Sequence, residues 1–135
     1  TIIWLENRNS YIPFQNITQK NTKVSLILYR LWIQNKQGEI LVVKRPEGKW
    51  LEGQWELPTY KALCDQLNFN QYPSWESSEE PEVLFSLNSL ITKYKIKNII
   101  LKSSSIKIPN SMWIKDIQDV QTSSVTQKIW KSLTL

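Results

Sequence analysis

Blocks of apolar residues separated by polar stretches divide the chain into an irregular N-terminal part and a series of regular elements. Residues 7–23 are polar and aperiodic and include Pro13, a composition typical of a linker. Two apolar runs rich in β-branched residues follow at 24–33 and 39–45, and residues 35–38 between them have the composition of a turn. We therefore predict a β-hairpin whose strands are covered on both faces, because both runs are almost continuously apolar.

The second half of the chain predicts two helices. Residues 77–80 match a capping box, Pro81 follows, and apolar positions between 83 and 94 recur at helical spacing, which predicts a helix over 81–94. Ser124 and Gln127 have the spacing of a second capping box, which predicts a final helix. One side of that helix is apolar and consists of Val125, Ile129, Trp130 and Leu133.

The remaining segments are shorter. Residues 60–67 are compatible with a strand or a short helix. Strands are predicted at 98–101 and 106–108, and residues 102–105 either separate them or join them in one longer, bent strand. Taken in order, these elements predict one α+β domain with α/β/α layering, in which a mixed sheet is flanked by helices.

Composition narrows the chemistry that the chain can perform. It contains one cysteine, Cys64, and no histidine, which excludes disulfides, Cys-His zinc sites and Ser-His-Asp triads. Any chemistry would therefore be performed by carboxylates, lysines or hydroxyls. A net charge of +5 favours an anionic partner such as nucleic acid, although a lysine-rich surface also promotes solubility. No apolar run approaches the ~20 residues that span a bilayer, so no membrane segment is expected.

The segment RPEGKWLEGQWELP, residues 45–58, resembles the start of a Nudix fold. Its matching positions are Arg45, Pro46, Gly48, Gly53, Trp55, Glu56, Leu57 and Pro58. The resemblance is closest to the Nudix-like C-terminal domain of A/G-specific adenine DNA glycosylases, the MutY family. Three further segments agree with it: Tyr11-Ile12-Pro13 in the linker, the turn with Gly38, and residues 124–130 of the last helix.

This resemblance implies a role in base excision repair. Residues 1–23 would follow a preceding catalytic domain, and residues 24–135 would form the Nudix-like C-terminal domain. In the family, this domain is not catalytic: it recognises double-stranded DNA with an 8-oxoguanine:adenine mispair, and the N-terminal domain of the same chain, which carries a 4Fe-4S cluster, cleaves the glycosidic bond. The resemblance therefore implies no cofactor and no enzymatic activity in this chain alone. It also implies a monomer in the bacterial cytoplasm, acting at the nucleoid. Because the sequence starts with Thr1 and shows no signal peptide, we expect it to be part of a longer polypeptide.

The sequence departs from active Nudix hydrolases, which hold divalent metal with several carboxylates on one helix. Thr59 and Tyr60 stand where the hydrolases have two glycines, and the expected helix at 81–94 has no acidic face. Four acidic residues do cluster at or before that helix: Glu76, Glu79, Glu80 and Glu82. Capping and the helix dipole explain them better than a metal site does. We therefore expect no nucleoside diphosphate hydrolysis.

Candidate DNA-binding residues come from the same comparison. In the family, a Phe-Ser/Thr-His-like motif on the strand after the helix reads the lesion. Residues 101–103 or, in a shifted register, 100–102 align with it, and neither register supplies the histidine. Lysines 93, 95, 97, 102, 107 and 115 concentrate in this region and suit phosphate contacts, or else form a solvated surface. The predicted DNA or lesion contacts are Lys102, Ser103, Ser104, Lys97, Lys107 and Trp50.

The tryptophans support a second hypothesis. On the strand of the WELP segment, Trp55 and Leu57 should point inward and Glu56 the other way. Trp50 lies in a loop and is expected either to be exposed for a ligand or to seal one end of a sheet. Together with Trp75 and Trp113, these residues could form an aromatic surface on a degenerate Nudix domain that binds a nucleotide or a protein. An active Nudix hydrolase is the third possibility.

Overall fold

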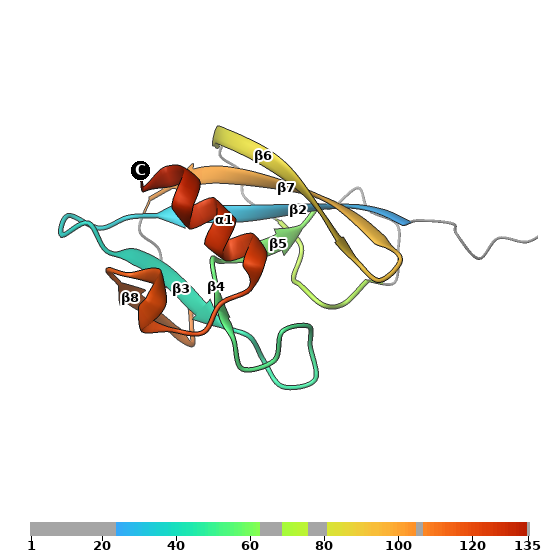
Figure 1. The fold of residues 1–135 in the computed structure, drawn as a ribbon, viewed down its shortest axis with the longest axis horizontal. Helices are drawn as coiled ribbons and strands as arrows, with labels where there is room; N and C mark the ends of the chain where they lie inside the picture. Colours follow the sequence, from blue (N-terminus) through green and yellow to red (C-terminus); the bar gives the residue numbers. More distant parts are fainter. Residues whose placement is uncertain (1–23, 63–68, 76–80, 105–106, 135) are drawn as a thin grey trace, which may run out of the picture. The chain divides into compact units, whose positions relative to one another are not determined.

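The computed structural model describes residues 24–62, 69–75, 81–104 and 107–134. The elements in these ranges are, in chain order, β2 (Val24–Ile33), β3 (Ile40–Lys44), β4 (Trp55–Glu56), β5 (Thr59–Lys61), β6 (Glu82–Ile91), β7 (Tyr94–Ser103), β8 (Ser111–Ile114), the 3-10 helix η2 (Ile117–Asp119) and α1 (Ser124–Leu133) (Figure 1). None of these helices is long and apolar enough to cross a membrane.

The chain divides into two compact units. The smaller unit contains, among described residues, Val24, Ser25 and residues 90–95, where the turn between β6 and β7 lies. In it, the backbone N–H of Val24 donates to the carbonyl of Lys93 at 2.8 Å, and Thr92 adopts a left-handed conformation with a φ of 49°. The larger unit comprises residues 26–89 and 96–135 and contains all the polar clusters and pockets considered below.

The strands of the expected hairpin belong to two different sheets. A four-stranded sheet has the order β5-β2-β7-β6, and a three-stranded sheet has the order β4-β3-β8. Between β2 and β3, pairing is limited to a bridge from Gln34 to Ile40 next to a turn in which Gly38 has a φ of 84°. The two strands and their turn were predicted correctly, but beyond this bridge each strand pairs with partners from later in the chain.

Both faces of these strands are buried, as the continuous apolar runs predicted. Trp32 of β2 and Ile40 and Val42 of β3 contribute to one core cluster. Their neighbours along each strand, which point to the other face, contribute to a second cluster. The second cluster consists of Leu31, Ile33, Leu41 and Leu101. Side chains of a strand alternate between faces, so each strand supplies both cores.

Helix α1 covers the first cluster. Ile129 is fully buried, Trp130 is 8% exposed, and the Trp130 ring contacts Trp32 edge to face at 5.5 Å between centroids. Val125 and Leu133 pack against the same cluster, so the predicted apolar side is confirmed. The cap differs from the prediction by one residue: Ser123, and not Ser124, is the N-cap, and its side chain accepts a hydrogen bond from the N–H of Thr126.

The helix predicted over 81–94 is wrong, because residues 82–91 form strand β6. Exposure alternates along it: Phe85, Leu87 and Ser89 are half-buried, whereas Ser86 and Asn88 are exposed. This period of two competes with the helical spacing of the same apolar residues, and pairing with β7 decides in favour of the strand. The expected cap at 77–80 lies outside the described residues.

Of the two short strands predicted here, the one at 98–101 is confirmed and the one at 106–108 is wrong at residues 107 and 108. Residues 98–101 form the second half of the longer strand β7, which continues through Ser103. Residues 107 and 108 are not part of a strand, and the next strand is β8, from Ser111 to Ile114. The ambiguous segment at 60–67 begins within strand β5, and residues 63–68 lie outside the described ranges.

Candidate nucleic-acid interface

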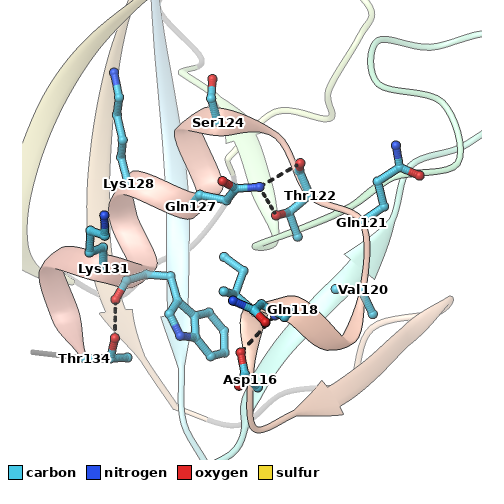
Figure 2. Close-up of a pocket in the computed structure, with 12 residues that line it drawn as sticks. Asp116, Gln118, Val120, Gln121, Thr122, Ser124, Gln127, Lys128, Lys131 and Thr134 are labelled. Carbon is cyan, nitrogen blue, oxygen red and sulfur yellow. Dashed lines mark hydrogen bonds between the residues drawn. The ribbon is translucent and has the colours of Figure 1, made fainter.

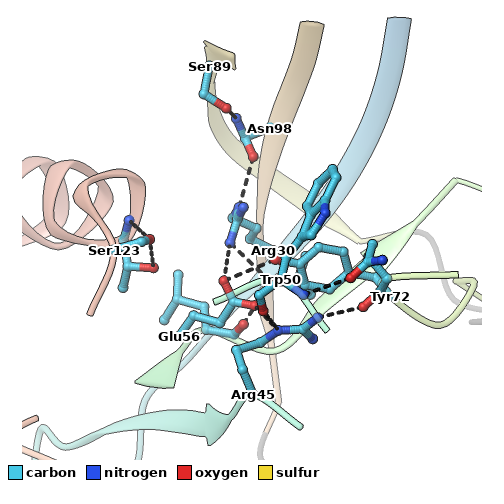
Figure 3. A network of polar contacts seen from close by, with 12 residues as sticks. Arg30, Arg45, Trp50, Glu56, Tyr72, Ser89, Asn98 and Ser123 are labelled. Atoms are coloured by element: carbon cyan, nitrogen blue, oxygen red, sulfur yellow. Dashed lines mark hydrogen bonds and ion pairs between the residues drawn. The ribbon is translucent and has the colours of Figure 1, made fainter. Parts of the chain in front are cut away.

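A buried carboxylate at the end of the loop that follows β3 lies between two arginines. Glu56 on β4 is 2% exposed, and its Oε2 lies 3.1 Å from Nη1 of Arg30 on β2, which is equally buried (Figure 3). Its Oε1 lies 3.2 Å from Nε of Arg45, just after β3. Oε1 receives no hydrogen bond from a described residue, so its contact with Arg45 is an ion pair only. Two guanidinium groups around one carboxylate leave a net buried charge of +1.

Neutral polar groups complete the surroundings of Arg30. Its Nε donates to Oδ1 of Asn98 on β7 at 2.9 Å, and its Nη1 also donates to Oγ1 of Thr59 at 3.2 Å. Asn98 in turn donates to Oγ of Ser89 on β6 at 3.0 Å. Because buried charge is stable only when it is paired and hydrogen-bonded, these contacts explain how an arginine is tolerated within an apolar strand.

Tyr72 belongs to the same network. Its hydroxyl donates to Oε2 of Glu56 at 3.3 Å, and Cζ of Arg45 lies 4.0 Å above its ring. Burial, together with the nearby Glu56 carboxylate, raises the pKa of the Tyr72 phenol far above its ordinary value. The phenol therefore stays protonated and serves as a hydrogen-bond donor.

Arg45 also shapes the loop that follows β3. Its Nε donates to the carbonyl of Trp50 at 2.9 Å, and its Nη2 donates to the carbonyl of Gln71 at 2.6 Å. The Trp50 ring packs against Phe69 at 5.1 Å between centroids, and its backbone N–H donates to the Gln71 side chain. Trp50, a predicted DNA contact, is thus half-buried in its own loop cluster.

A pocket of about 230 Å³, here called the Arg45 pocket, adjoins this network. Its walls come from the ends of β3 and β4, from β5, and from the segment that precedes β8. The lining residues are Val43, Lys44, Arg45, Pro46, Glu56, Leu57, Pro58, Thr59, Tyr60, Pro73, Ile108, Pro109 and Asn110. The structure therefore brings the loop after β3 together with the segment that directly follows Lys107, another predicted contact.

The predicted lysine contacts do not form one cluster. Lys97 and Lys102 are both exposed on β7, but they are five residues apart and so project from opposite faces of the strand. Ser103 ends β7, and its Oγ donates to the carbonyl of the exposed Ser104 at 3.4 Å. Lys107 is exposed next to the Arg45 pocket. Lys102, Ser103 and Ser104 thus form a contiguous polar end of the strand, whereas Lys97 lies apart from them.

Residues 101–103 were aligned with the lesion-reading motif of the MutY family on the assumption that a helix over 81–94 precedes them. In the structure residues 82–93 form β6 and the turn to β7, so the strand that follows a helix in the family cannot be identified by this register. The assignment of Leu101, Lys102 and Ser103 to the family's motif loses that support. Their role in binding DNA stays a prediction that rests on exposure and charge.

A second and larger pocket, here called the α1 groove, lies beside the last helix and has a volume of about 770 Å³ (Figure 2). It is formed by η2, by the segment between η2 and α1, and by one side of α1. The lining residues are Asp116, Ile117, Gln118, Val120, Gln121, Thr122, Ser124, Gln127, Lys128, Trp130, Lys131 and Thr134. Sequence reasoning did not identify this surface, although Lys128 and Lys131 recur on the side of the helix opposite the predicted apolar one.

The tryptophans do not form one surface. Trp75 packs against Tyr29 and Tyr60, and Trp113 lies against the same second core cluster, whereas Trp55 packs against the first. All of them are half-buried. The expected alternation of Trp55, Glu56 and Leu57 is confirmed, with the difference that Glu56 is buried as well.

The acidic residues considered for a metal site are mostly outside the described residues. Glu76, Glu79 and Glu80 lie there, and Glu82 is exposed at the start of β6. Within the described ranges, no group of three or more histidine, cysteine, aspartate or glutamate side chains could hold a metal ion.

Comparisons with known proteins define the class of fold. No family model and no curated protein sequence matches the chain. Among solved structures, it is similar to the C-terminal domain of mouse MUTYH in complex with human PCNA, with a TM-score of 0.53 and 15% identity over 78% of this chain and 85% of that one. It is also similar to a MutT NUDIX hydrolase from Burkholderia pseudomallei, with a TM-score of 0.55 and 16% identity over 83% and 100% of the chains. The protein therefore has an α+β, Nudix-like fold, as predicted.

Proposed function

We propose that this domain recognises double-stranded DNA that contains an 8-oxoguanine:adenine mispair and that it has no catalytic activity of its own. The observation that carries the proposal is the segment at 45–58. This segment resembles the MutY family, and in the structure it runs from Arg45 to β4 within a fold similar to the C-terminal domain of MUTYH. The sequence resemblance is what singles out the MutY family, because the fold is also similar to that of a MutT NUDIX hydrolase.

The departures from the hydrolases favour binding over catalysis. The two residues after Pro58 are Thr59 and Tyr60 of strand β5, and Thr59 is engaged in the buried network through its hydroxyl. A hydrolase has two glycines here, at the approach to its metal-binding carboxylates. In the proposed parent, adenine excision and the 4Fe-4S cluster belong to the N-terminal domain of the same chain. This domain holds the duplex as a monomer, in the bacterial cytoplasm at the nucleoid.

The polar end of β7 and the Arg45 pocket are the proposed contact region. Lys102 and Lys107 are exposed, and neither forms an ion pair with a described residue. Exposed lysines supply affinity for phosphates without reading the bases. The hydroxyls of Ser103 and Ser104, between the two lysines, are the groups that could reach a base edge.

Binding of labelled duplexes tests the proposal. We expect the domain to bind a duplex with one 8-oxoguanine:adenine pair more tightly than the same duplex with guanine:cytosine, at both low and moderate salt. Lys102→Ala should weaken binding to both duplexes, and Ser103→Ala should reduce the preference for the lesion. Lys36→Ala, in the exposed turn after β2, is the matched control and should change neither. Equal affinity of the unaltered domain for both duplexes would refute lesion reading.

A protein partner is the second candidate function. It is favoured by one observation: the similar C-terminal domain of MUTYH was solved in complex with human PCNA. Binding of PCNA to the domain in a pull-down or by calorimetry, with no duplex affinity at low salt, would support this role over DNA recognition.

A further inference from the structure

One side of helix α1 carries an uninterrupted polar stripe along the α1 groove. Ser124 lies three residues before Gln127 and four before Lys128, and Lys131 lies four residues after Gln127 and three after Lys128, which places all four on a single side of the helix. All four are exposed. Figure 2 shows the side chains of Ser124, Lys128 and Lys131 projecting in the same direction from α1.

The charge of this stripe is positive, and no described residue forms an ion pair with it. Helix α1 contains no acidic residue, and neither Lys128 nor Lys131 forms an ion pair with a described residue. The groove's one acidic side chain, Asp116, is engaged elsewhere: its Oδ1 accepts the backbone N–H of Gln118 at 2.9 Å as the cap of η2. Two lysines against one aspartate leave the lining with a net charge of +1.

The other polar groups of the groove are hydrogen-bonding amides and hydroxyls. The Gln127 amide is fixed by Thr122, at 3.3 Å from its hydroxyl, and the Thr134 hydroxyl donates to the carbonyl of Trp130 at 2.7 Å. Ser124 and Gln121 are exposed, and their side chains form no hydrogen bond with a described residue. Lysine, serine, threonine and glutamine are the side chains that commonly contact phosphate and sugar in DNA complexes.

The apolar part of the groove offers little to a peptide. Trp130 is only 8% exposed because it packs into the core, and Ile117 and Val120 pack against the same core cluster. Peptide grooves depend on accessible apolar pockets for anchor side chains. The groove is charged and rich in hydrogen-bonding groups, and its apolar residues are packed into the core. It therefore suits a sugar-phosphate backbone better than a peptide.

We propose that the α1 groove binds the phosphodiester backbone of DNA, with Lys128 and Lys131 contacting phosphates. This inference rests on the proposed function, since it names a surface where the same domain holds the duplex, separate from the polar end of β7. Contacts of this kind carry no sequence or lesion information. The groove therefore contributes affinity equally to damaged and undamaged DNA.

The test compares two double variants that remove the same charge. In Lys128→Gln/Lys131→Gln, affinity for both duplexes should fall about tenfold, and the slope of log K against log salt should shrink by about 2, since each lost phosphate contact removes about 0.9. The control, Lys36→Gln/Lys95→Gln, changes exposed lysines that line neither the groove nor the Arg45 pocket and should have a much smaller effect. Charge reversal, Lys128→Glu/Lys131→Glu, should weaken binding further, and unchanged thermal unfolding of all variants shows that the fold is intact.

The outcomes separate this inference from the proposed function. If the unaltered domain prefers the lesion duplex and the groove variants bind as tightly as the control, the groove proposal is wrong and DNA recognition stands. If the domain binds both duplexes equally and the groove variants weaken both, the groove proposal is supported and lesion reading fails. A labelled polyglutamate peptide whose binding requires Lys128 and Lys131, while duplex binding does not, would overturn the proposal in favour of an acidic protein partner.

Discussion

Glu56 shares its carboxylate between Arg30 and Arg45, and this triad was only partly visible in the sequence. Alternation along WELP predicted that Glu56 would point away from Trp55 and Leu57, and it does. That the opposite side is also buried could not be predicted, because it depends on strands far apart in the chain. The available signal was Arg30 itself, a charge in the middle of the apolar run VSLILYRLWI.

Removing the charge of Glu56 should strongly destabilise the domain. Glu56→Gln leaves two buried guanidinium groups without a counter-charge, and breaking a buried pair in this way costs about 3–5 kcal/mol. Urea denaturation followed by tryptophan fluorescence measures the change. Glu47→Gln, an exposed glutamate in the same loop, is the control and should stay within about 0.5 kcal/mol of the unaltered domain. A loss of the same size in both variants would contradict a buried triad.

Tyr72 should make stability sensitive to alkaline pH. Its pKa is raised in the folded protein by burial and by Glu56, whereas in the unfolded chain it is near 10.0. A raised folded pKa favours the neutral form in the native state, so this contribution is complete below pH 10.0 and is lost as pH rises above it. Tyr72→Phe should cost about 1 kcal/mol at neutral pH, through the lost hydrogen bond to Glu56. The gap between the two proteins should then close or reverse in alkaline urea titrations, and a constant gap would contradict the raised pKa.

Among the elements, those defined by continuous apolar runs were predicted best. Strands β2 and β3 and helix α1 agree with their expected ranges within about two residues. Strand β6 failed because its apolar residues satisfy both the helical and the alternating period, and the choice between them depends on pairing with β7.

The position of the α1 cap can be tested directly. Ser123→Ala should destabilise the domain by about 1 kcal/mol, because it removes the acceptor for the N–H of Thr126. Ser124→Ala, the cap expected from sequence, should be nearly neutral. Thermal unfolding distinguishes the two, and a larger effect at Ser124 would assign the cap to that residue.

The turn between β6 and β7 carries a strained residue. Thr92 is β-branched and has a φ of 49°, in the left-handed region that disfavours a Cβ. Thr92→Gly should stabilise the domain by roughly 0.5–1 kcal/mol, since relief of about 1–2 kcal/mol exceeds the entropic cost of glycine. Thr92→Ala keeps the Cβ and should bring no such gain when both variants are compared by chemical denaturation.

For the molecule as a whole, the fold class could be predicted and the candidate site only in fragments. The α+β, Nudix-like architecture followed from the order of elements and the segment at 45–58. The site depends on which segments lie side by side in the fold. No local pattern predicts that Ile108 and Pro109 line the same pocket as Arg45, or that α1 and η2 line one groove. Such convergence is set by sheet order, which local patterns do not encode.

We expect the domain as a whole to have no Nudix hydrolase activity. Incubation with 8-oxo-dGTP and Mg²⁺ should release no pyrophosphate above the background of a protein-free sample, because Thr59 and Tyr60 occupy the positions of the two glycines of the hydrolases. Release that depends on both the domain and Mg²⁺ would restore the hydrolase interpretation and refute a purely DNA-binding role.

The contacts of Arg30 join elements of both sheets. Its Nε–H donates to Asn98 on β7 of the four-stranded sheet, while its Nη1 donates to Glu56 on β4 of the three-stranded one. A guanidinium held in this way rotates slowly and exchanges its protons slowly with water, so its Nε–H should give a separate, protected signal in an NMR spectrum. The Nε–H signal would report pairing within the four-stranded sheet during refolding, whereas protection of the Nη1 protons donated to Glu56 would report the docking of the two sheets.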